Sequence, residues 1–513
     1  MTSTKDEKIQ ALEQTLCELD EEIKRLLSRK TKCLRQLNDL KAYTAILPVE
    51  LLSSIFENAC SDTTLPPLTL GAVSSHWRNV TWSCPRLWTS IRITIMPEAA
   101  RIPEQTYHLL RLYFTNAQAL PLSLQLVGIK GPATIRREPT VPRKQLLDLI
   151  LNENQDRLGA LAFTFIQSTW WDDMHQSASP ICLLPTLKTL ELGWSLTVPG
   201  PRRMQFICPN LTSASLSGHV TPVELPWRQL TRLKLYGLPI DRCLSLLFEC
   251  PLLEEYHCDL ARWIHPTQSE FVSILAREDV TLPNLRKFGW WFLNDDWTDF
   301  LMDVQFPSLL HLSSLANVSD FHRSSIYPLP HHFIKNCTRL KSFMGDIRFI
   351  WRGPSLDGYT IDIEDENIDE GVSGLLSGED LEELAVHNLD VHDFRFIFDQ
   401  LTVVHHPAYW DNLSRLRNLS VRGANLPRDI FNLDVFLSFV RFLGSRRSGF
   451  KLERLPKPYS RIECIRLAPI DSFQLPVGSS EDMIAQFREL REIVRSGLRI
   501  ELQDSSGKTV VWS

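Results

Sequence analysis

The chain has 513 residues, which corresponds to about three to four globular domains, or one elongated array, at about 150 residues per domain. Hydrophobic residues make up 43% and charged residues 23%, values typical of folded proteins, so a disordered chain is excluded. The 55 basic and 61 acidic side chains give a net charge of only −6, which argues against nucleic acid as a partner. Leucine accounts for 79 of the 513 residues, so its spacing is informative.

The sequence predicts a soluble protein of the cytoplasm, the nucleus or both. No stretch of the chain has the length and apolarity of a membrane span, and the N-terminal residues lack the apolar run of a secretory signal. The eleven cysteines are scattered and none is spaced as a Cys-x-x-Cys pair. This distribution speaks against a disulfide framework and against a zinc site.

Residues 5–42 carry a heptad pattern. One polar side chain, Lys30, interrupts a stripe whose members follow at alternating steps of three and four: Ile9, Leu12, Leu16, Leu19, Ile23, Leu26, Cys33, Leu37 and Leu40. A repeat of 3.5 residues keeps one stripe facing a partner helix, so this segment is predicted to be a coiled-coil helix. Two alternatives remain open. The stripe packs against a second copy of the chain, or it packs onto its own chain or stays unpaired.

The next segment, residues 46–93, predicts a small cluster of helices. Pro48 suits a first helical turn, and apolar side chains follow at helical spacing up to Ala59. A polar loop over residues 61–67 precedes a second helical segment. The apolar face expected for that segment comprises Leu70, Val73, Trp77 and Val80. So few residues cannot bury this much apolar surface by themselves, which indicates an interaction surface.

This stretch resembles the F-box, in particular the F-box-like subclass, in three blocks that occur in the expected order. The blocks are Leu47-Pro48-Val49-Glu50-Leu51-Leu52 with Ile55-Phe56, then Val73 with Trp77-Arg78, then Pro85-Arg86-Leu87-Trp88-Thr89-Ser90-Ile91. The resemblance implies docking on the Skp adaptor of a cullin-type (SCF) ubiquitin ligase. The residues that the resemblance implies form or support this contact are Leu47, Pro48, Leu51, Leu52, Ile55, Phe56, Trp77, Leu87 and Trp88. The alternative interpretation is that these side chains only form the core of a helical domain.

Beyond residue 120 the chain repeats a short apolar pattern. Leucine at position i is followed by apolar side chains at i+3 and usually at i+5, with polar neighbours between them, as in a strand with one buried face. Eleven starts occur, at a mean step of about 30 residues. These are Leu158, Leu187, Leu211, Leu230, Leu253, Leu285, Leu309, Leu340, Leu381, Leu416 and Ile462.

The segment 120–505 resembles a degenerate leucine-rich-repeat domain. Helix-like stretches such as 241–249 and 431–443 lie between the repeats. The resemblance implies an irregular solenoid with a parallel sheet on its concave side, because such units bury their apolar faces only by stacking. The predicted fold class is therefore α/β: a coiled-coil-like helix, an all-α module and a repeat array. The other fold considered is an irregular α/β domain.

Three further features of this segment have two possible interpretations each. Cys208, Cys250 and Cys337 precede strands and are expected to be buried thiols rather than functional ones. The acidic stretch 357–370 is expected to be a solvated loop, with contact to a basic ligand as the alternative. Tryptophans at 170–171, 290–291, 297 and 351 belong either to a concave recognition face or to the core.

The sequence contains no motif for catalysis or for phosphate binding. The adjacent histidine pairs at 331–332 and 405–406 point in different directions, so we expect no metal site, no cofactor and no enzymatic activity. Two hypotheses follow. The chain is either a substrate receptor of an SCF ligase, with the repeats binding an unidentified protein client, or a non-ligase scaffold that oligomerises through its N-terminal helix.

Overall fold

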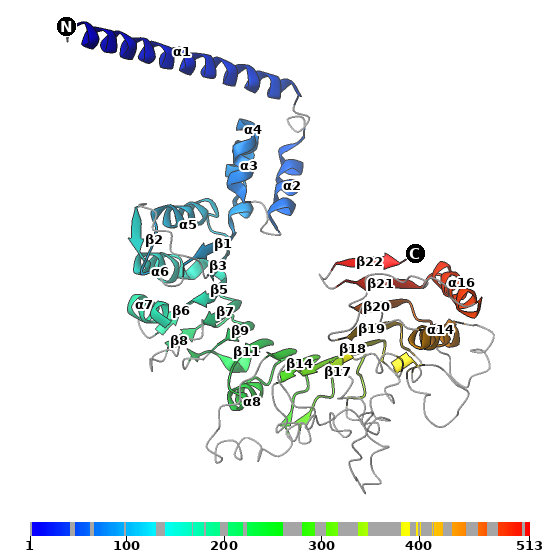
Figure 1. Ribbon diagram of the computed structural model, residues 1–513. Coiled ribbons are helices and arrows are strands. Elements are labelled where there is room, and N and C mark those ends of the chain that lie inside the picture. Colours follow the sequence, from blue (N-terminus) through cyan, green and yellow to red (C-terminus); the bar gives the residue numbers. More distant parts are fainter. Residues whose placement is uncertain are drawn as a thin grey trace. The chain divides into compact units, whose positions relative to one another are not determined.

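The computed structural model describes residues 3–512 with gaps. The gaps are 42–46, 62–65, 97–98, 130–138, 167, 179–180, 195–203, 219–222, 260–279, 293–303, 317–336, 347–380, 390–394, 396, 399–400, 402–412, 414, 424–432, 448–459, 469–480 and 505–507. The fold is mixed α/β, as predicted, with a long N-terminal helix and a large, mostly parallel sheet (Figure 1). The chain divides into two compact units. Unit 1 comprises Met1–Ile93 and Pro103–Leu124, and unit 2 comprises Thr94–Ile102 and Gln125–Ser513.

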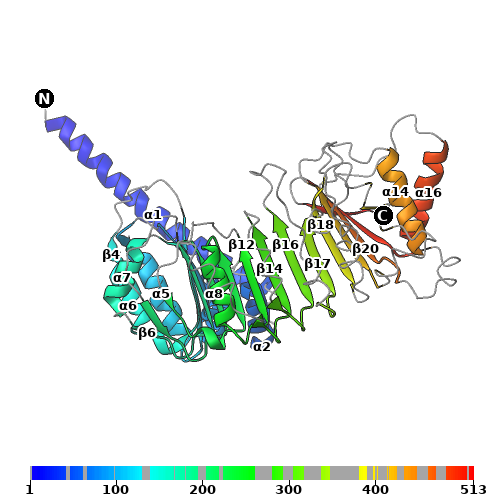
Figure 2. The ribbon, with the colours of Figure 1, turned by 90° about the horizontal axis from the view of Figure 1, so that it is seen from below.

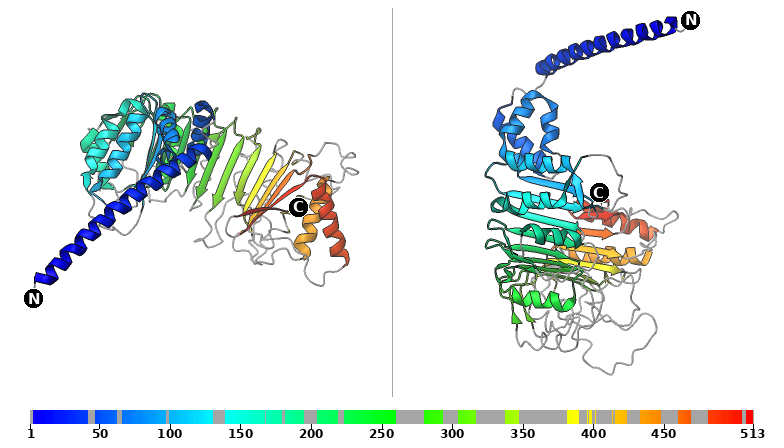
Figure 3. Two further views of the ribbon diagram at one scale, coloured as in Figure 1. Left: turned by 90° about the horizontal axis from the view of Figure 1, so that it is seen from above. Right: turned by 90° about the vertical axis from the view of Figure 1, so that its left-hand side faces the viewer.

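Unit 1 is largely helical. Its elements are α1 (Ser3–Lys41), α2 (Val49–Ser61), α3 (Pro67–Val73), α4 (Ser75–Ser83), the 3-10 turn η2 (Pro85–Trp88) and α5 (Glu104–Asn116). Helix α1 runs without a break for 39 residues, about 58 Å at 1.5 Å per residue (Figure 3). Helix α2 begins directly after Pro48, whose carbonyl accepts the Leu52 N–H at 3.0 Å.

The second predicted helix of this unit is in fact two helices, so the prediction was wrong here. Ser74 is extended (φ −154°, ψ 168°) between α3 and α4, and its Oγ accepts the Trp77 N–H at 3.1 Å. This side chain caps the first turn of α4, which favours a new helix over continuation of α3. The break means that Val73 is exposed while Leu70 and Val80 are buried, rather than all three lying on one face.

The strands belong mainly to one sheet of fifteen. In order across the sheet they are β1 (Ser90–Ile95), β3 (Leu122–Gly128), β5 (Leu158–Ile166), β7 (Thr189–Trp194), β9 (Ser213–Ser217), β11 (Arg232–Tyr236), β12 (Glu255–Asp259), β14 (Lys287–Phe292), β16 (His311–Ala316), β17 (Ser342–Asp346), β18 (Glu383–Leu389), β19 (Asn418–Gly423), β20 (Cys464–Ala468), β21 (Arg499–Gln503) and β22 (Thr509–Trp512). Strands β5 to β21 pair in parallel, and β22 closes the sheet antiparallel to β21.

All eleven predicted starts introduce one strand of this sheet, from β5 to β20, and every starting side chain is buried. The chain therefore adds each strand beside the preceding one, as Figure 2 shows for β12 to β20. A recurring turn precedes the strands. For example, the Leu253 N–H donates to the Cys250 carbonyl at 3.3 Å. The Glu254 and Glu255 N–H groups then both donate to the carbonyl of Thr231, the residue before β11, at 2.8 and 3.0 Å. These bonds fix the register of each strand on its neighbour.

Short strands form three smaller sheets. Strands β6 (Ile181–Leu183), β8 (Met204–Ile207) and β10 (Val223–Glu224) form a parallel set, β13 (Val280–Thr281) pairs with β15 (Val304–Gln305), and β2 (Arg101–Pro103) lies beside β4 (Thr140–Pro142). The remaining 3-10 turns are η3 (Gln155–Arg157) and η4 (Trp227–Gln229).

The helices of unit 2 pack against one face of the large sheet. They are α6 (Arg143–Leu151), α7 (Ser168–Ala178), α8 (Ile240–Glu249), α14 (Leu433–Arg447) and α16 (Glu481–Arg495). The two helical segments predicted near 241–249 and 431–443 correspond to α8 and α14. Helix α8 is tied to the sheet by the buried Tyr256, whose hydroxyl donates to the Cys243 carbonyl at 2.9 Å. The core of unit 2 lies on the inner side of these helices and of the short strands, against the large sheet; Phe288 of β14, for example, packs on Phe306 beside β15 at 5.1 Å.

Candidate functional site

The helical module of unit 1 is organised around Trp88. Its indole is fully buried, donates through Nε1 to the Thr81 carbonyl at 2.9 Å, and meets Trp82 and Tyr113 edge-on at 5.1 Å each. Burial raises the pKa of Tyr113 to about 12, with a smaller contribution from Cys60. Trp88 therefore holds together α4, η2 and α5 rather than facing a partner.

Helix α2 has one buried and one exposed apolar face. Leu52 and Phe56 point inward, and the Phe56 ring lies 4.7 Å from that of Trp77. Leu51 and Ile55 are 55% and 50% exposed. Residues four apart lie on one helical face, and Pro48 precedes Leu51 by three, so Pro48, Leu51 and Ile55 form an exposed stripe that we call the α2 outer face.

The nine residues predicted to contact the adaptor thus fall into three groups. Three lie on the α2 outer face, two are half-buried, and four are buried in the core of the module. The half-buried residues are Leu47 and Trp77, and the buried ones are Leu52, Phe56, Leu87 and Trp88. The four buried residues lie where the alternative interpretation, that these side chains form the core of a helical domain, would place them.

Among the described residues, four exposed large apolar residues of this module were not among the predicted contacts. They are Val49 on α2, Leu68 and Val73 on α3, and Trp82 on α4. Val49 and Val73 belong to the F-box-like blocks, so the sequence did carry a signal for them. Leu68 and Trp82 lie outside the blocks, and only the three-dimensional packing identifies them as exposed.

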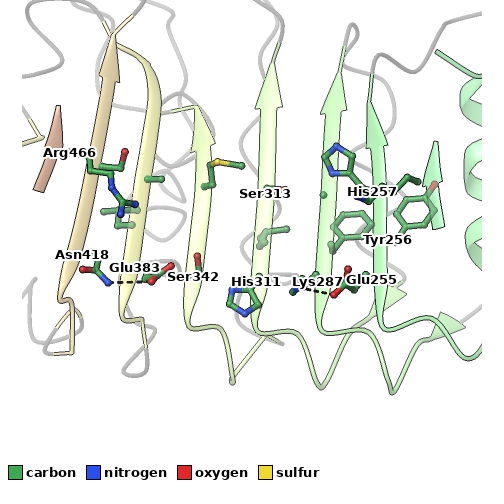
Figure 4. Close-up of a pocket in the computed structure, with 18 of the residues that line it drawn as sticks. Glu255, Tyr256, His257, Lys287, His311, Ser313, Ser342, Glu383, Asn418 and Arg466 are labelled. Carbon is green, nitrogen blue, oxygen red and sulfur yellow. Dashed lines mark hydrogen bonds and ion pairs between the residues drawn. The ribbon is translucent and has the colours of Figure 1, made fainter. Parts of the chain in front are cut away.

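A second candidate site is a hollow of about 540 Å³ on the face of the large sheet opposite α8 (Figure 4). Two rows of side chains line it, at matching positions of eight neighbouring strands from β11 to β20. The first row is Arg232, Glu255, Lys287, His311, Ser342, Glu383, Asn418 and Cys464, and the second is Lys234, His257, Gly289, Ser313, Met344, Ala385, Ser420 and Arg466. We call this surface the sheet groove.

The centre of the sheet groove has a floor of small side chains. At Gly289 a Cβ would overlap Nδ1 of His257 and would lie 2.8 Å from Oγ of Ser313, so a larger residue there would displace both side chains. The imidazole and the hydroxyl therefore approach the main chain of β14 from both sides. The polar side chains of the first row flank this low floor, which leaves room for an extended chain to lie across the strands.

The charges of the sheet groove are unevenly distributed. Lys287 pairs with Glu255 at 2.7 Å, Asn418 donates to Glu383 at 3.2 Å, and Arg466 pairs at 2.6 Å with the glutamate at position 501 of β21. Among the residues that the structure describes, Arg232 and Lys234 on β11 have no acidic partner. The β11 end of the groove is therefore positive and suits an acidic group.

The floor also holds a neutral histidine beside this positive end. Burial lowers the pKa of His257 below its ordinary value of 6.5, the positive charge of Lys234 lowers it further, and Asp259 opposes both effects. A neutral imidazole has one donor and one acceptor nitrogen. It can therefore form hydrogen bonds with a peptide as well as with an acid.

Several predictions for unit 2 concern the core. Trp170, Trp171 and Trp290 are buried, so the core interpretation applies to them, and Arg143 lies 5.0 Å above the Trp170 ring. The buried thiols were predicted correctly: burial raises the pKa of Cys208, Cys250 and Cys337 to about 12. The acidic stretch 357–370, Trp297, Trp351 and both histidine pairs lie outside the described residues.

No group of three histidine, cysteine or acidic side chains is placed as metal ligands would be, within the part of the chain that the structure describes. Of the helices described, none is long and apolar enough to cross a membrane. Comparison of the sequence with known family models and with curated proteins finds no match.

Proposed function

We propose that this chain is the substrate-recognition subunit of an SCF-type ubiquitin ligase and that residues 46–93 dock on the Skp adaptor. One observation carries the proposal. The segment that resembles an F-box folds as a compact helical module and leaves apolar side chains of its first block, Leu51 and Ile55, uncovered on the α2 outer face. Exposed aliphatic groups on a rigid helix are typical of the centre of a protein interface.

Burial of the α2 outer face by a partner contributes favourable binding free energy. Full burial of a leucine or isoleucine side chain contributes about 1.5–3 kcal/mol, so covering the exposed half of Leu51 and of Ile55 contributes about 1 kcal/mol each. The buried residues contribute indirectly, because Leu52 and Phe56 fix the rotation of α2 and so determine which side chains face outward. In this proposal the α2 outer face contacts the adaptor and the buried group supports it.

The test is recovery of the Skp adaptor by the purified full-length chain. A variant with Leu51→Asp and Ile55→Asp places two charges on the α2 outer face and is expected to lose adaptor binding while its helical module stays folded. The control carries Thr69→Asp and Asn79→Asp at exposed polar positions of α3 and α4, adds the same charge and is expected to bind as the wild type. Equal adaptor recovery by the wild type and the outer-face variant would contradict the proposal.

The choice of exposed positions matters for this test. Aspartate at Leu52 or Trp88 would place a charge in the core of the module and unfold it, so loss of binding would carry no information about the contact. Hydrogen exchange of the α2 amides reports the folding of each variant. Only variants with wild-type protection are compared for binding.

For unit 2 we propose a leucine-rich-repeat solenoid that holds the client. In support, eleven starts with a buried aliphatic residue each lead into one parallel strand in sequence order, with the recurring turn described above. Eight strands about 4.8 Å apart make the sheet groove about 34 Å long, which matches an extended segment of about ten residues. Arg232 and Lys234, which have no acidic partner among the described residues, favour a client segment with an acidic group at the β11 end.

Comparative capture separates the two sites. Ala385→Trp fills the floor of the sheet groove, and Gln205→Trp, on the exposed side of β8, adds the same side chain elsewhere. Proteins retained by the outer-face variant and by Gln205→Trp, but lost with Ala385→Trp, are clients. The adaptor is expected to be lost with the outer-face variant and retained by Ala385→Trp. A set of captured proteins that Ala385→Trp leaves unchanged would contradict the sheet groove as the client site.

The role assigned to the chain is geometric rather than catalytic. It raises the effective concentration of the client near the transferred ubiquitin without supplying an acid, a base or a nucleophile. This role fits a protein of the cytoplasm, the nucleus or both. The second candidate function, a non-ligase scaffold that oligomerises through α1, is favoured by the exposed stripe of that helix. Adaptor binding distinguishes the two, since the scaffold requires none.

A further inference from the structure

The apolar stripe of α1 is uncovered. Seven of its members are between 45% and 69% exposed: Ile9, Leu12, Leu16, Leu19, Ile23, Leu26 and Leu37. No described side chain packs over them. In water a helix obtains most of its stability from packing of its apolar face, so a 39-residue helix with such a stripe requires a partner.

The identity of the stripe residues points to a second copy of the same helix. In heptad terms the a positions are Ile9, Leu16, Ile23, Lys30 and Leu37, and the d positions are Leu12, Leu19, Leu26 and Cys33. Isoleucine at a followed by leucine at d, as in Ile9 with Leu12 and Ile23 with Leu26, favours two parallel strands. The same stripe on each copy is self-complementary, as a two-fold symmetric interface demands.

The flanking residues agree with a parallel pair. Lys8 occupies a g position and Glu13 the next e position, and both are exposed. In a parallel dimer in register, Lys8 lies beside Glu13 of the partner subunit, and two-fold symmetry repeats this attraction on the other side. Asp20 occupies the next e position. Leu27 and Leu34 occupy the two after it, where the aliphatic stem of a g residue such as Arg29 covers them.

Lys30 selects the register and the direction. In register, the two copies of Lys30 share a single layer, and every other a layer from Ile9 to Leu37 stays apolar. A shift by one heptad places each lysine against an aliphatic side chain of the partner. An antiparallel pair with Ile23 against Leu26 does the same, because Lys30 then faces Leu19. In both arrangements two layers lose an apolar contact instead of one. A single lysine at an a position is a known means of specifying register at a cost in stability.

From these observations we infer that α1 forms a parallel, in-register, two-stranded coiled coil with a second copy of this chain. The inference does not rest on adaptor docking, because it uses α1 alone; it specifies the arrangement of the oligomer in the second candidate function. It predicts a dimer whether or not the adaptor binds.

Light scattering of the full-length chain at micromolar concentration tests the association. The expected mass is twice the 59.1 kDa of one chain. A variant with Leu19→Asp and Leu26→Asp in the stripe is expected to be a monomer. Its control carries Gln14→Asp and Ser28→Asp at f positions of the same helix and is expected to remain a dimer. A monomeric wild type, or dissociation of the control to the same extent, would overturn the inference.

Two exposed cysteines test the orientation. Cys33 occupies a d position, where a parallel pair brings both copies together, and Cys17 occupies a b position, which faces away from the partner. Diamide, which removes two electrons and two protons from a pair of thiols and is itself reduced to the hydrazine, is expected to yield a covalent dimer. The dimer should form with Cys17→Ser and fail to form with Cys33→Ser. The parallel arrangement would be overturned if the covalent dimer requires both cysteines. It would also be overturned if the wild type associates but yields no covalent dimer.

Discussion

At the scale of single residues, exposure decides what an apolar side chain of the helical module does. Leu51 and Leu52 are adjacent and identical in type, yet one is exposed and the other buried. The helical spacing of the sequence predicted that both belong to one wide apolar face of α2, and both do lie on this helix. It did not reveal which half of that face the neighbouring helices cover, since this depends on the break at Ser74 and on the packing of Trp77 against Phe56.

Trp88→Ala is expected to destabilise the module by about 3–5 kcal/mol, because it removes a buried indole together with its hydrogen bond to Thr81. Leu51→Ala removes a half-exposed side chain and should change stability by less than about 0.5 kcal/mol. Hydrogen exchange of the α2 and α4 amides measures both effects. Similar loss of protection in the two variants would contradict the division into supporting and contacting residues.

His257 is expected to make the stability of unit 2 depend on pH. Burial lowers its pKa in the folded chain, so below about pH 6.5 the unfolded chain binds more protons and the free energy of unfolding decreases. One such group contributes a slope of at most about 1.4 kcal/mol per pH unit. Unfolding of the wild type and of His257→Asn is compared between pH 5 and 8. The difference should grow as the pH falls below 6.5, and a constant difference would contradict the assignment.

At the scale of elements, the strands of unit 2 were predictable because each repeats one physical pattern. A buried leucine and two alternate apolar positions suffice to mark a strand between polar neighbours. Strand β21 escaped detection although Ile500 and Leu502 keep the pattern, because Gly497, with φ +104°, replaces the starting leucine after α16. The small sheet of β6, β8 and β10 was missed because two to four residues are too few to show a period.

Strand β22 protects the edge of the large sheet. It pairs antiparallel with β21, and Trp512 meets the Phe487 ring of α16 edge-on at 5.7 Å. Deletion of residues 509–513 leaves β21 with unpaired amides, so faster hydrogen exchange in β21 and a larger aggregated fraction are expected. Val511→Lys, at an exposed position of β22, keeps the pairing and serves as the control. Unchanged exchange in the truncated chain would contradict a protective role.

At the scale of the whole molecule, we propose that separate parts of the chain have separate tasks. In this proposal the α2 outer face contacts the adaptor, the sheet groove holds a client, and α1 joins two copies. Leucine serves all three tasks through different spacings, which is why its frequency alone suggested no function. Because the surfaces share no residues, a substitution that impairs one of these surfaces should leave the other two tasks intact.

Isothermal titration of the purified Skp adaptor into the full-length chain tests adaptor docking through the α2 outer face. We expect one adaptor per chain, a negative heat-capacity change from burial of apolar surface, and at least about tenfold weaker binding, or about 1.4 kcal/mol, for Leu51→Ala combined with Ile55→Ala. Absence of binding by the wild type, or equal affinity of the variant, would contradict the claim.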